Sequence, residues 1–379
     1  MPASPKVIHC VPALFGEQGG IVGGGERYAY ELARYMADLT PTTILSYGPQ
    51  DFEEQRGPLR VRILGNPHYV RGQRSNPLIF RRYLRQLSHA DVIHCHQKSV
   101  ALSSLAAAYG RFTGRPVFTS DLGGGGWDIS SYISTDKWYR GHLHISSYSR
   151  TISGHGSAPW ATVIYGGVDS SLFCPSVNPG NRRSVVFTGR LMPHKGVNDL
   201  VEAIPATLPL AIIGQPYHEE FVELLKQLSL GKNVSFLHGL NDRQLVSAYQ
   251  SALCVVLPSV YKSVFGGETL VPELLGQTLL EGMACGAPVL CTDVASMPEI
   301  VRHGIDGFVV PPNNPGALRE RIVWLSEHPE EAAKMGANGR QRILDHFVWP
   351  TVARRCLEFY SSVGKRSDIY VSELGHGKP

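Results

Sequence analysis

Residues 254–291 read CVVLPSVYKSVFGGETLVPELLGQTLLEGMACGAPVLC and predict two strands with a helix between them. The runs 254–257 and 288–291 are short and apolar, which is typical of buried strands. The apolar spacing that begins near Gly276 is helical instead. A strand, a crossover helix and a second strand form the βαβ unit of a parallel sheet. This stretch therefore predicts an α/β fold.

The same alternation extends along the rest of the chain. Short apolar runs, many of them separated by helical patterns, predict parallel sheets that are buried on both faces. Proline, glycine and asparagine interrupt the pattern between Phe173 and Arg183, which indicates a linker. We therefore expect two Rossmann-like domains, 1–175 and 176–350, that face each other across a cleft with the ligand at the strand ends. The expected strands are 6–11, 43–46, 61–64, 91–94, 116–119, 144–146 and 162–165 in the first half, and 184–188, 209–213, 233–237, 254–257, 288–291 and 307–310 in the second.

The composition is that of an ordinary globular protein. The chain has 379 residues, of which 43% are hydrophobic and 18% charged, and this balance argues against long disorder. The net charge of +4 is small for a nucleic-acid binder. Seven cysteines without a CxxC pair favour reduced core residues. No signal-peptide pattern and no bilayer-spanning apolar run are visible, so we expect a cytoplasmic protein.

Two glutamates flank the start of the helix expected near Gly276. Glu273 precedes its first turn, and Glu281 lies eight positions later, more than one turn inside the helix. Eight residues of helix rise roughly 12 Å, which separates the carboxylates too far for a paired acid and base. The free amides of the helix start, near Leu275, Gly276 and Gln277, suit a phosphate. A sugar at Glu273, a diphosphate at the amides and a ribose at Glu281 form a coherent set; the alternative is two unrelated surface glutamates.

Two loops offer further contacts to an anionic ligand. The segment FTGRLMPHKG, residues 187–196, carries Arg190 and Lys195 just after an expected strand. Both cations can neutralise a departing diphosphate without a metal, and the chain contains no Asp-x-Asp pair. The segment GGIVGGGERY, residues 19–28, follows the first strand, where glycines let the backbone approach an anion. The alternatives are solvated surface cations and a flexible loop.

Together these motifs resemble the retaining GT-B glycosyltransferases of family 4. The family's E-x-F-G-x-x-x-x-E motif, followed by A-x-G-x-P-V, is similar to ELLGQTLLEGMACGAPVL, with Leu275 in place of the Phe. Its G-R-x-x-x-x-K-G signature is similar to GRLMPHKG. The resemblance implies a GT-B fold, with Glu273 on the donor sugar and Glu281 on the ribose hydroxyls. It also places Gly24 and Gly25 against the donor phosphate or the acceptor.

Two histidines end a strand in the first half. The segment DVIHCH, residues 91–96, is similar to the family's D-x-x-H-x-H strand end, which implies an acceptor-side role for His96. His94 and His96 face the same side of a strand, so a zinc site is one interpretation. No third ligand with suitable spacing follows, and a structural role is the alternative for His94.

The segment SDLGGGGWD, residues 120–128, departs from the family. Relatives commonly place a His near such glycines, where this chain offers Asp121 or Leu122. Asp121 could still hydrogen-bond a sugar hydroxyl, so we expect a changed donor preference. The family also implies that a C-terminal helix, about 351–379, packs back onto the first domain.

We therefore expect a retaining hexosyltransferase that uses a nucleoside diphosphate sugar, with Glu273, Arg190, Lys195 and Asp121 as the catalytic set and no metal. A hydroxyl of a glycan or glycolipid is the expected acceptor, in cell-envelope polysaccharide synthesis. The alternatives are a transferase of secondary metabolism of the aminosugar-antibiotic type, another GT-B enzyme such as an epimerase or phosphorylase, and an inert sugar-nucleotide-binding partner. An arginine group either forms a solvated helix face or contacts a phosphorylated acceptor or anionic lipid at the inner face of the membrane. Its members are Arg71, Arg74, Arg81, Arg82 and Arg85.

Overall fold

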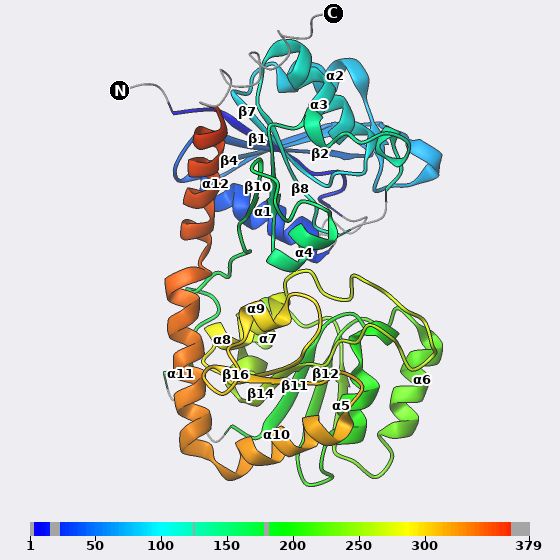
Figure 1. Ribbon diagram of the computed structural model, residues 1–379, viewed down its shortest axis with the longest axis vertical. Helices are drawn as coiled ribbons and strands as arrows, with labels where there is room; N and C mark the ends of the chain where they lie inside the picture. Colours follow the sequence, from blue (N-terminus) through cyan, green and yellow to red (C-terminus); the bar gives the residue numbers. More distant parts are fainter. Residues whose placement is uncertain (1–3, 16–22, 124–125, 178–181, 365–379) are drawn as a thin grey trace, which may run out of the picture. The chain divides into compact units, whose positions relative to one another are not determined.

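The computed structural model describes residues 4–15, 23–123, 126–177 and 182–364 and divides the chain into two compact units. Unit 1 runs to Tyr165 and takes in the C-terminal residues from Trp349, and unit 2 is Gly166–Val348. Each unit contains a parallel sheet with helices packed against it (Figure 1). The division falls at residue 165 rather than 175 because Val168 bridges to Val348 and the Arg340 guanidinium donates to the carbonyl of Phe173 at 2.9 Å.

The main sheet of unit 1 has the strand order β10-β9-β8-β7-β1-β2-β4-β3. All neighbours are parallel except the edge strand β3, which is antiparallel to β4. A separate short ribbon pairs β5 (His68–Tyr69) with β6 (Pro77–Leu78). The strands of the main sheet are β1 (Val7–Cys10), β2 (Thr42–Gly48), β3 (Phe52–Arg56), β4 (Leu59–Gly65), β7 (Val92–His96), β8 (Val117–Ser120), β9 (Gly141–His144) and β10 (Ala161–Val163).

Helices cover this sheet with two apolar clusters. One cluster joins the sheet to α2 and α3 through residues such as Tyr83 and Leu102, and the other joins it to α1 through Ala29 and Ala33. Figure 1 shows α2 and α3 on one side of the sheet and α1 on the other. The C-terminal helix α12 packs against α1, where Trp349 contacts the ring of Tyr28. The helices are α1 (Gly24–Ala37), α2 (Phe80–Leu87), α3 (Ala101–Thr113), α4 (Ser147–Ile152) and α12 (Trp349–Gly364), with the 3-10 turns η1 (Val70–Gly72), η2 (Ile129–Ser131) and η3 (Asp136–Trp138).

The sheet of unit 2 is parallel throughout, with the order β13-β12-β11-β14-β15-β16. Every residue of β14 is buried, and α8 and α10 both contact this strand. The strands are β11 (Ser184–Thr188), β12 (Leu210–Ile213), β13 (Val234–Leu237), β14 (Ala252–Leu257), β15 (Val289–Thr292) and β16 (Gly307–Val310). The helices are α5 (Val197–Ala203), α6 (Glu219–Leu228), α7 (Asp242–Gln250), α8 (Gln277–Ala284), α9 (Met297–Ile300), α10 (Pro315–Glu327) and α11 (Pro329–His346), with the 3-10 turn η4 (Pro193–Lys195).

The α/β prediction with two parallel-sheet, Rossmann-like units is confirmed, and one strand is displaced from its expected place. The strand expected at 144–146 is β9, Gly141–His144. It ends early because Ser146 caps α4: its hydroxyl accepts from the Ser149 amide at 3.0 Å, and Ser149 returns the bond. Among the described residues, no helix is both long and apolar enough to cross a bilayer.

Candidate functional site

An ion pair forms at the carboxyl ends of the neighbouring parallel strands β11 and β14. Lys195 Nζ contacts Glu273 Oε1, and these side chains are only 11% and 13% exposed. The Ser259 hydroxyl donates to the same carboxylate oxygen at 3.3 Å. Two of the predicted catalytic residues, 78 positions apart in the chain, are thus in direct contact.

A glycine fixes the loop that carries Lys195. Lys195 ends η4, and the next residue, Gly196, has a left-handed φ of 62°. A Cβ at Gly196 would lie 2.0 Å from the carbonyl oxygen of Pro258, just beyond β14. The carbonyl of His194 also accepts from the Val260 amide at 2.9 Å. Glycine therefore allows the loop after β11 to lie against the end of β14.

Helix α8 starts between the two predicted glutamates. Its N-cap is Gly276, with a φ of 79° and no side chain to cap the first amides. The side chain of Leu275 is buried, and the Gln277 side-chain amide donates to the carbonyl of Gly167 at 3.1 Å. Leu275 and Gly276 can therefore contact a ligand only through their backbone, at a helix start that favours an anion.

Glu281 lies inside α8 and is only 8% exposed. The Tyr249 hydroxyl donates to Glu281 Oε2 at 3.0 Å. Burial and the nearby Glu281 carboxylate raise the pKa of Tyr249 well above its ordinary value, so the hydroxyl keeps the proton that it donates. A buried carboxylate held in this way is positioned to accept a hydrogen bond from a ligand hydroxyl.

Arg190 lies outside the ion pair of Lys195 and Glu273. It is exposed, and its guanidinium carbon lies 5.9 Å from the ring centroid of Tyr217. Between the two cations, burial and the charge of Lys195 lower the pKa of His194 to about 4. His194 is therefore neutral near pH 7 and adds no third positive charge to this loop. The contact of Arg190 with a diphosphate stays a prediction.

In unit 1, the glycines that open α1 lie beside the segment that follows β8. A Cβ at Gly25 would lie 3.4 Å from the Cβ of Leu122, whereas a Cβ at Gly24 would meet open space. Asp121 is partly buried and accepts from the Gly123 amide at 3.2 Å, and burial raises its pKa. The structure thus brings Gly25 and Leu122 together near the ends of β1 and β8. The remaining glycines at 19–20 and 124–125 lie outside the described residues.

His96 belongs to a buried group of three imidazoles, which we call the β1–β7 cluster: His9, His94 and His96. His9 Nδ1 and His96 Nε2 are 2.7 Å apart, and His96 is 3% exposed. The Tyr360 hydroxyl of α12 bonds His94 Nδ1 at 2.7 Å. The third imidazole that the spacing in β7 lacked comes from β1, where His9 is in register with His94. Spacing within one strand cannot show this, since it depends on the pairing of two strands. The acceptor role of His96 stays a prediction.

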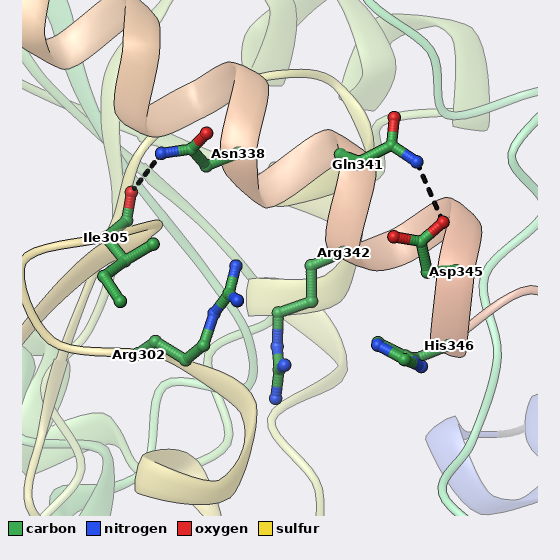
Figure 2. A pocket seen from close by; sticks show the side chains of 7 residues that line it. All are labelled: Arg302, Ile305, Asn338, Gln341, Arg342, Asp345 and His346. Atoms are coloured by element: carbon green, nitrogen blue, oxygen red, sulfur yellow. Dashed lines mark hydrogen bonds between the residues drawn. The ribbon is translucent and has the colours of Figure 1, made fainter.

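A hollow of about 260 Å³ lies beside α11 in unit 2 (Figure 2). Its lining includes Arg302 and Arg342, but both guanidinium groups already have partners. Arg302 Nε contacts the fully buried carboxylate of Asp306 at 2.6 Å, and Arg342 Nε donates to the carbonyl of Ile300 at 3.0 Å. The lining contains none of the residues that the sequence assigns to a donor. We therefore assign no donor contact to this hollow.

Comparison with known proteins gives relatives along most of the chain. A GDP-mannose-dependent alpha-(1-6)-phosphatidylinositol monomannoside mannosyltransferase of Mycolicibacterium smegmatis is 27% identical over 370 residues, covering 91% of this chain and 95% of the relative. The D-rhamnosyltransferase WbpZ of Pseudomonas aeruginosa is 32% identical over 169 residues, covering 44% of this chain and 42% of the relative.

Solved structures share the fold. HepE of Anabaena, solved in complex with UDP and glucose, has a TM-score of 0.73 and 20% identity, covering 94% of this chain and all of that one (100%). Sucrose-phosphate synthase of Thermosynechococcus elongatus has a TM-score of 0.71 and 19% identity, covering 96% of this chain and 100% of that one. At such identities the likeness establishes the fold alone.

Two family models match adjoining parts of the chain. "Glycosyltransferase Family 4" matches residues 22–172, and "Glycosyl transferases group 1" matches residues 172–342. The second match contains the ion pair of Lys195 and Glu273, as well as Glu281, and the first contains Gly24, Gly25 and His96. The chain therefore belongs to the group 1 and family 4 glycosyltransferases, which have the GT-B fold.

Proposed function

We propose that this glycosyltransferase moves a hexosyl unit from a nucleoside diphosphate sugar to a hydroxyl group of a glycan or glycolipid, with retention at the anomeric carbon. The observation that carries the proposal is the ion pair of Lys195 and Glu273. Glu273 lies four residues before Gln277, the first residue of α8. The ion pair combines a cation suited to a diphosphate and a carboxylate suited to a sugar in one mostly buried position.

The leaving group gains negative charge as its bond to the sugar breaks. Lys195, Arg190 and the first amides of α8 are all positive or partly positive. We assign the diphosphate to these groups, which stabilise the charge that develops in the transition state. The acceptor oxygen bonds to the anomeric carbon, the bond from that carbon to the phosphate oxygen breaks, and the acceptor proton passes to the departing diphosphate.

Glu273 both holds Lys195 and offers oxygens to the sugar. An ammonium has three N–H donors, so Lys195 can contact the carboxylate and a phosphate at once. Glu273 can then accept a hydrogen bond from a sugar hydroxyl, while Glu281, held by Tyr249, accepts from the ribose. Asp121 and Gly25 in unit 1 are assigned to the donor sugar and phosphate on the family resemblance.

A glycolipid acceptor has support from a relative and from the surface of α2. The relative from Mycolicibacterium smegmatis is named for a phosphatidylinositol mannoside substrate. In this chain, Phe80 at the start of α2 is 59% exposed, and Arg81 and Arg85 of the same helix are exposed. An aromatic ring flanked by arginines suits peripheral contact with anionic lipid. We therefore propose a lipid-linked acceptor of the cell envelope at the inner face of the membrane.

Release of the nucleoside diphosphate separates this proposal from its alternatives. The protein is incubated with GDP-mannose, UDP-glucose and ADP-glucose, with and without a membrane lipid extract, and release is measured by mass spectrometry. We expect release from one donor that depends on the extract. Turnover without any acceptor would indicate an epimerase or a phosphorylase. Tight nucleotide binding without release from any donor would indicate an inert partner.

A matched pair of variants tests the role of Glu273. Glu273→Gln keeps the shape and removes the charge, and we expect transfer to fall by about 10²–10³-fold. Glu268→Gln changes a carboxylate in the same loop that is 73% exposed and pairs with Lys262, and it should keep wild-type activity. Equal rates for Glu273→Gln and wild type would overturn the assignment of Glu273.

A further inference from the structure

We propose that unit 1 binds a divalent transition-metal ion, such as Zn²⁺, between His142, His144 and His155, which we call the β9 cluster. One ring nitrogen of each histidine lies within 4.8 Å of a ring nitrogen of the others. His142 and His144 alternate along β9 and share one side of the strand. His155 follows α4, which Figure 1 labels, and returns to the same point. The proposal is independent of the donor residues of unit 2.

Asp136 provides the outer partners that metal-binding histidines normally have. Such a histidine usually donates its second ring N–H to a carboxylate or a backbone carbonyl, which fixes the tautomer. His142 Nε2 lies 3.1 Å from the carbonyl oxygen of Asp136, and His155 Nε2 lies 3.5 Å from its carboxylate Oδ2. The carbonyl oxygen only accepts, so it favours the proton on His142 Nε2 and leaves His142 Nδ1 with its lone pair. His155 Nε2 faces the carboxylate at 3.5 Å but is not hydrogen-bonded to it.

His144 completes the set from the other side. Its Nε2 lies 3.0 Å from His155 Nδ1, and its own Nδ1 is buried without a hydrogen-bond partner among the described residues. Two buried nitrogens of this cluster, His144 Nδ1 and His155 Nε2, thus have no hydrogen-bond partner among the described residues. Two nitrogens of a tetrahedral zinc ion lie about 3.3 Å apart, given Zn–N bonds of roughly 2.0 Å. The observed 3.0 Å between His144 Nε2 and His155 Nδ1 is close to that value, and a ring nitrogen of His142 lies within 4.8 Å of the other two ligand atoms.

The surroundings keep the three rings neutral and in place. They are only 2 to 4% exposed, and the Trp160 ring packs on His142 and His155 at 4.9 and 4.7 Å between centroids. Burial disfavours the charged form of an imidazole, and a metal binds the neutral form. Lys98 pairs with Asp136 Oδ1, whereas Oδ2 faces His155.

The β1–β7 cluster is the competing site, and its hydrogen bonds favour a structural role. His94 Nε2 bonds the Ser120 hydroxyl at 2.8 Å, and His94 Nδ1 bonds Tyr360 at 2.7 Å. His9 Nε2 contacts the sulfur of Met36 at 3.2 Å. Both nitrogens of His94 are thus bonded to hydroxyl groups, whereas no hydroxyl group of the described residues bonds His142, His144 or His155. The three imidazoles of the β9 cluster leave a fourth position for water.

Metal content and affinity test the proposal directly. The full-length protein, without a histidine tag, is stripped with a chelator, dialysed against ZnCl₂ and then against metal-free buffer, and its zinc is counted by mass spectrometry. We expect one ion per chain, a rise of several degrees in the melting temperature, and tetrahedral absorption bands with Co²⁺. No retained metal and no shift in the melting temperature would overturn the proposal.

Variants locate the ion. His144→Gln and His155→Gln should each weaken zinc binding by more than 100-fold, while His89→Gln, at an exposed histidine of the same unit, should bind like wild type. Asp136→Asn should weaken zinc binding by about 10–100-fold, because the carboxylate that faces His155 Nε2 is lost. His155 lies outside the helices and strands, so His155→Gln can test the site if His144→Gln does not fold. Loss of the ion in His96→Gln but not in His155→Gln would overturn the proposal.

Discussion

The two units of this protein bury different side chains on the strands of their sheets. In unit 2, the fully buried β14 consists of Ala252–Leu257, all apolar. In unit 1, the buried strands β1 and β7 carry His9, His94 and His96, and β9 carries two more histidines. Buried polar groups are stable only when they are hydrogen-bonded. Unit 1 therefore depends on a side-chain network in its strands, whereas the central strand of unit 2 depends on apolar packing, with the ion pair of Lys195 and Glu273 beyond the strand ends.

Acidification should unfold unit 1 before unit 2, and this is the largest difference that we expect between the two units. Burial lowers the pKa of His9 to about 3 and the pKa values of His94 and His96 well below the ordinary value of 6.5. As the pH falls below 6.5, the unfolded chain takes up protons that the folded unit does not, so the stability of unit 1 decreases. In unit 2, burial raises the pKa of Asp199 to about 6, so protonation between pH 6 and 4 favours its folded state.

Pulsed hydrogen–deuterium exchange can follow the two units separately. Samples without metal are held between about pH 7 and pH 4, the window set by these pKa values, and are labelled at one fixed pH. Peptides from β1 and β7 should lose protection at higher pH than peptides from β11 and β14. The pKa of His194 in unit 2 is also lowered, to about 4, so acidification destabilises unit 2 through this one residue. Unit 1 has three such histidines in the β1–β7 cluster. Simultaneous loss of protection in both units would contradict the expectation.

The next largest effect should follow from Lys195→Met, which removes the cation at the strand ends of unit 2. We expect kcat to fall by about 10²–10³-fold, or roughly 3–4 kcal/mol of transition-state stabilisation, with a smaller change in KM. The Glu273 carboxylate, 13% exposed, loses its ionic partner, which should destabilise unit 2 by about 1–3 kcal/mol. Lys262→Met, at a 66% exposed lysine, is the control. A change in KM alone would place Lys195 outside the transition state.

The strands of unit 2 were easier to predict from the sequence than those of unit 1. Strands β11 and β16 have the expected bounds, 184–188 and 307–310, because buried parallel strands are continuous apolar runs. Strand β9 was displaced because its sequence, Gly-His-Leu-His, looks polar, and the serines that follow it cap a helix. The edge strand β3 was missed because its charged sequence, Phe-Glu-Glu-Gln-Arg, resembles a loop.

The residues of the candidate site could be predicted singly, but not their contacts. Glu273 and Lys195 stand in recognisable motifs, whereas their ion pair depends on the close approach of Gly196 to Pro258, which is a tertiary feature. Tyr249, which holds Glu281, lies in α7, a helix to which the sequence assigned no role. Single-strand patterns cannot reveal such partners, because register and packing decide them.

Tyr249→Phe tests whether the buried polar groups of unit 2 serve a ligand. It removes the hydrogen bond to Glu281, and we expect KM for the donor to rise about 10-fold, or roughly 1.4 kcal/mol. Tyr261→Phe is the matched control, because the Tyr261 hydroxyl accepts from the Ala295 amide at 2.8 Å in the same unit. Both variants should lose about 1 kcal/mol of stability, and only Tyr249→Phe should change KM. Equal KM values would assign Glu281 to stability rather than to the ribose.

The smallest effect tests whether the histidines of unit 1 are held by hydrogen bonds or merely fill space. Tyr360→Phe removes the hydroxyl that bonds His94 Nδ1 at 2.7 Å and keeps the ring that packs on Phe118 at 4.7 Å between centroids. We expect a loss of about 1 kcal/mol, seen as a fall of roughly 2–4 °C in the melting temperature, with unchanged kcat. Ser361→Ala, at the exposed neighbouring position, should change neither quantity. If Tyr360→Phe also leaves the melting temperature unchanged, then the buried imidazole tolerates an unpaired nitrogen. The contrast between a hydrogen-bonded interior in unit 1 and an apolar one in unit 2 would then lose its energetic basis.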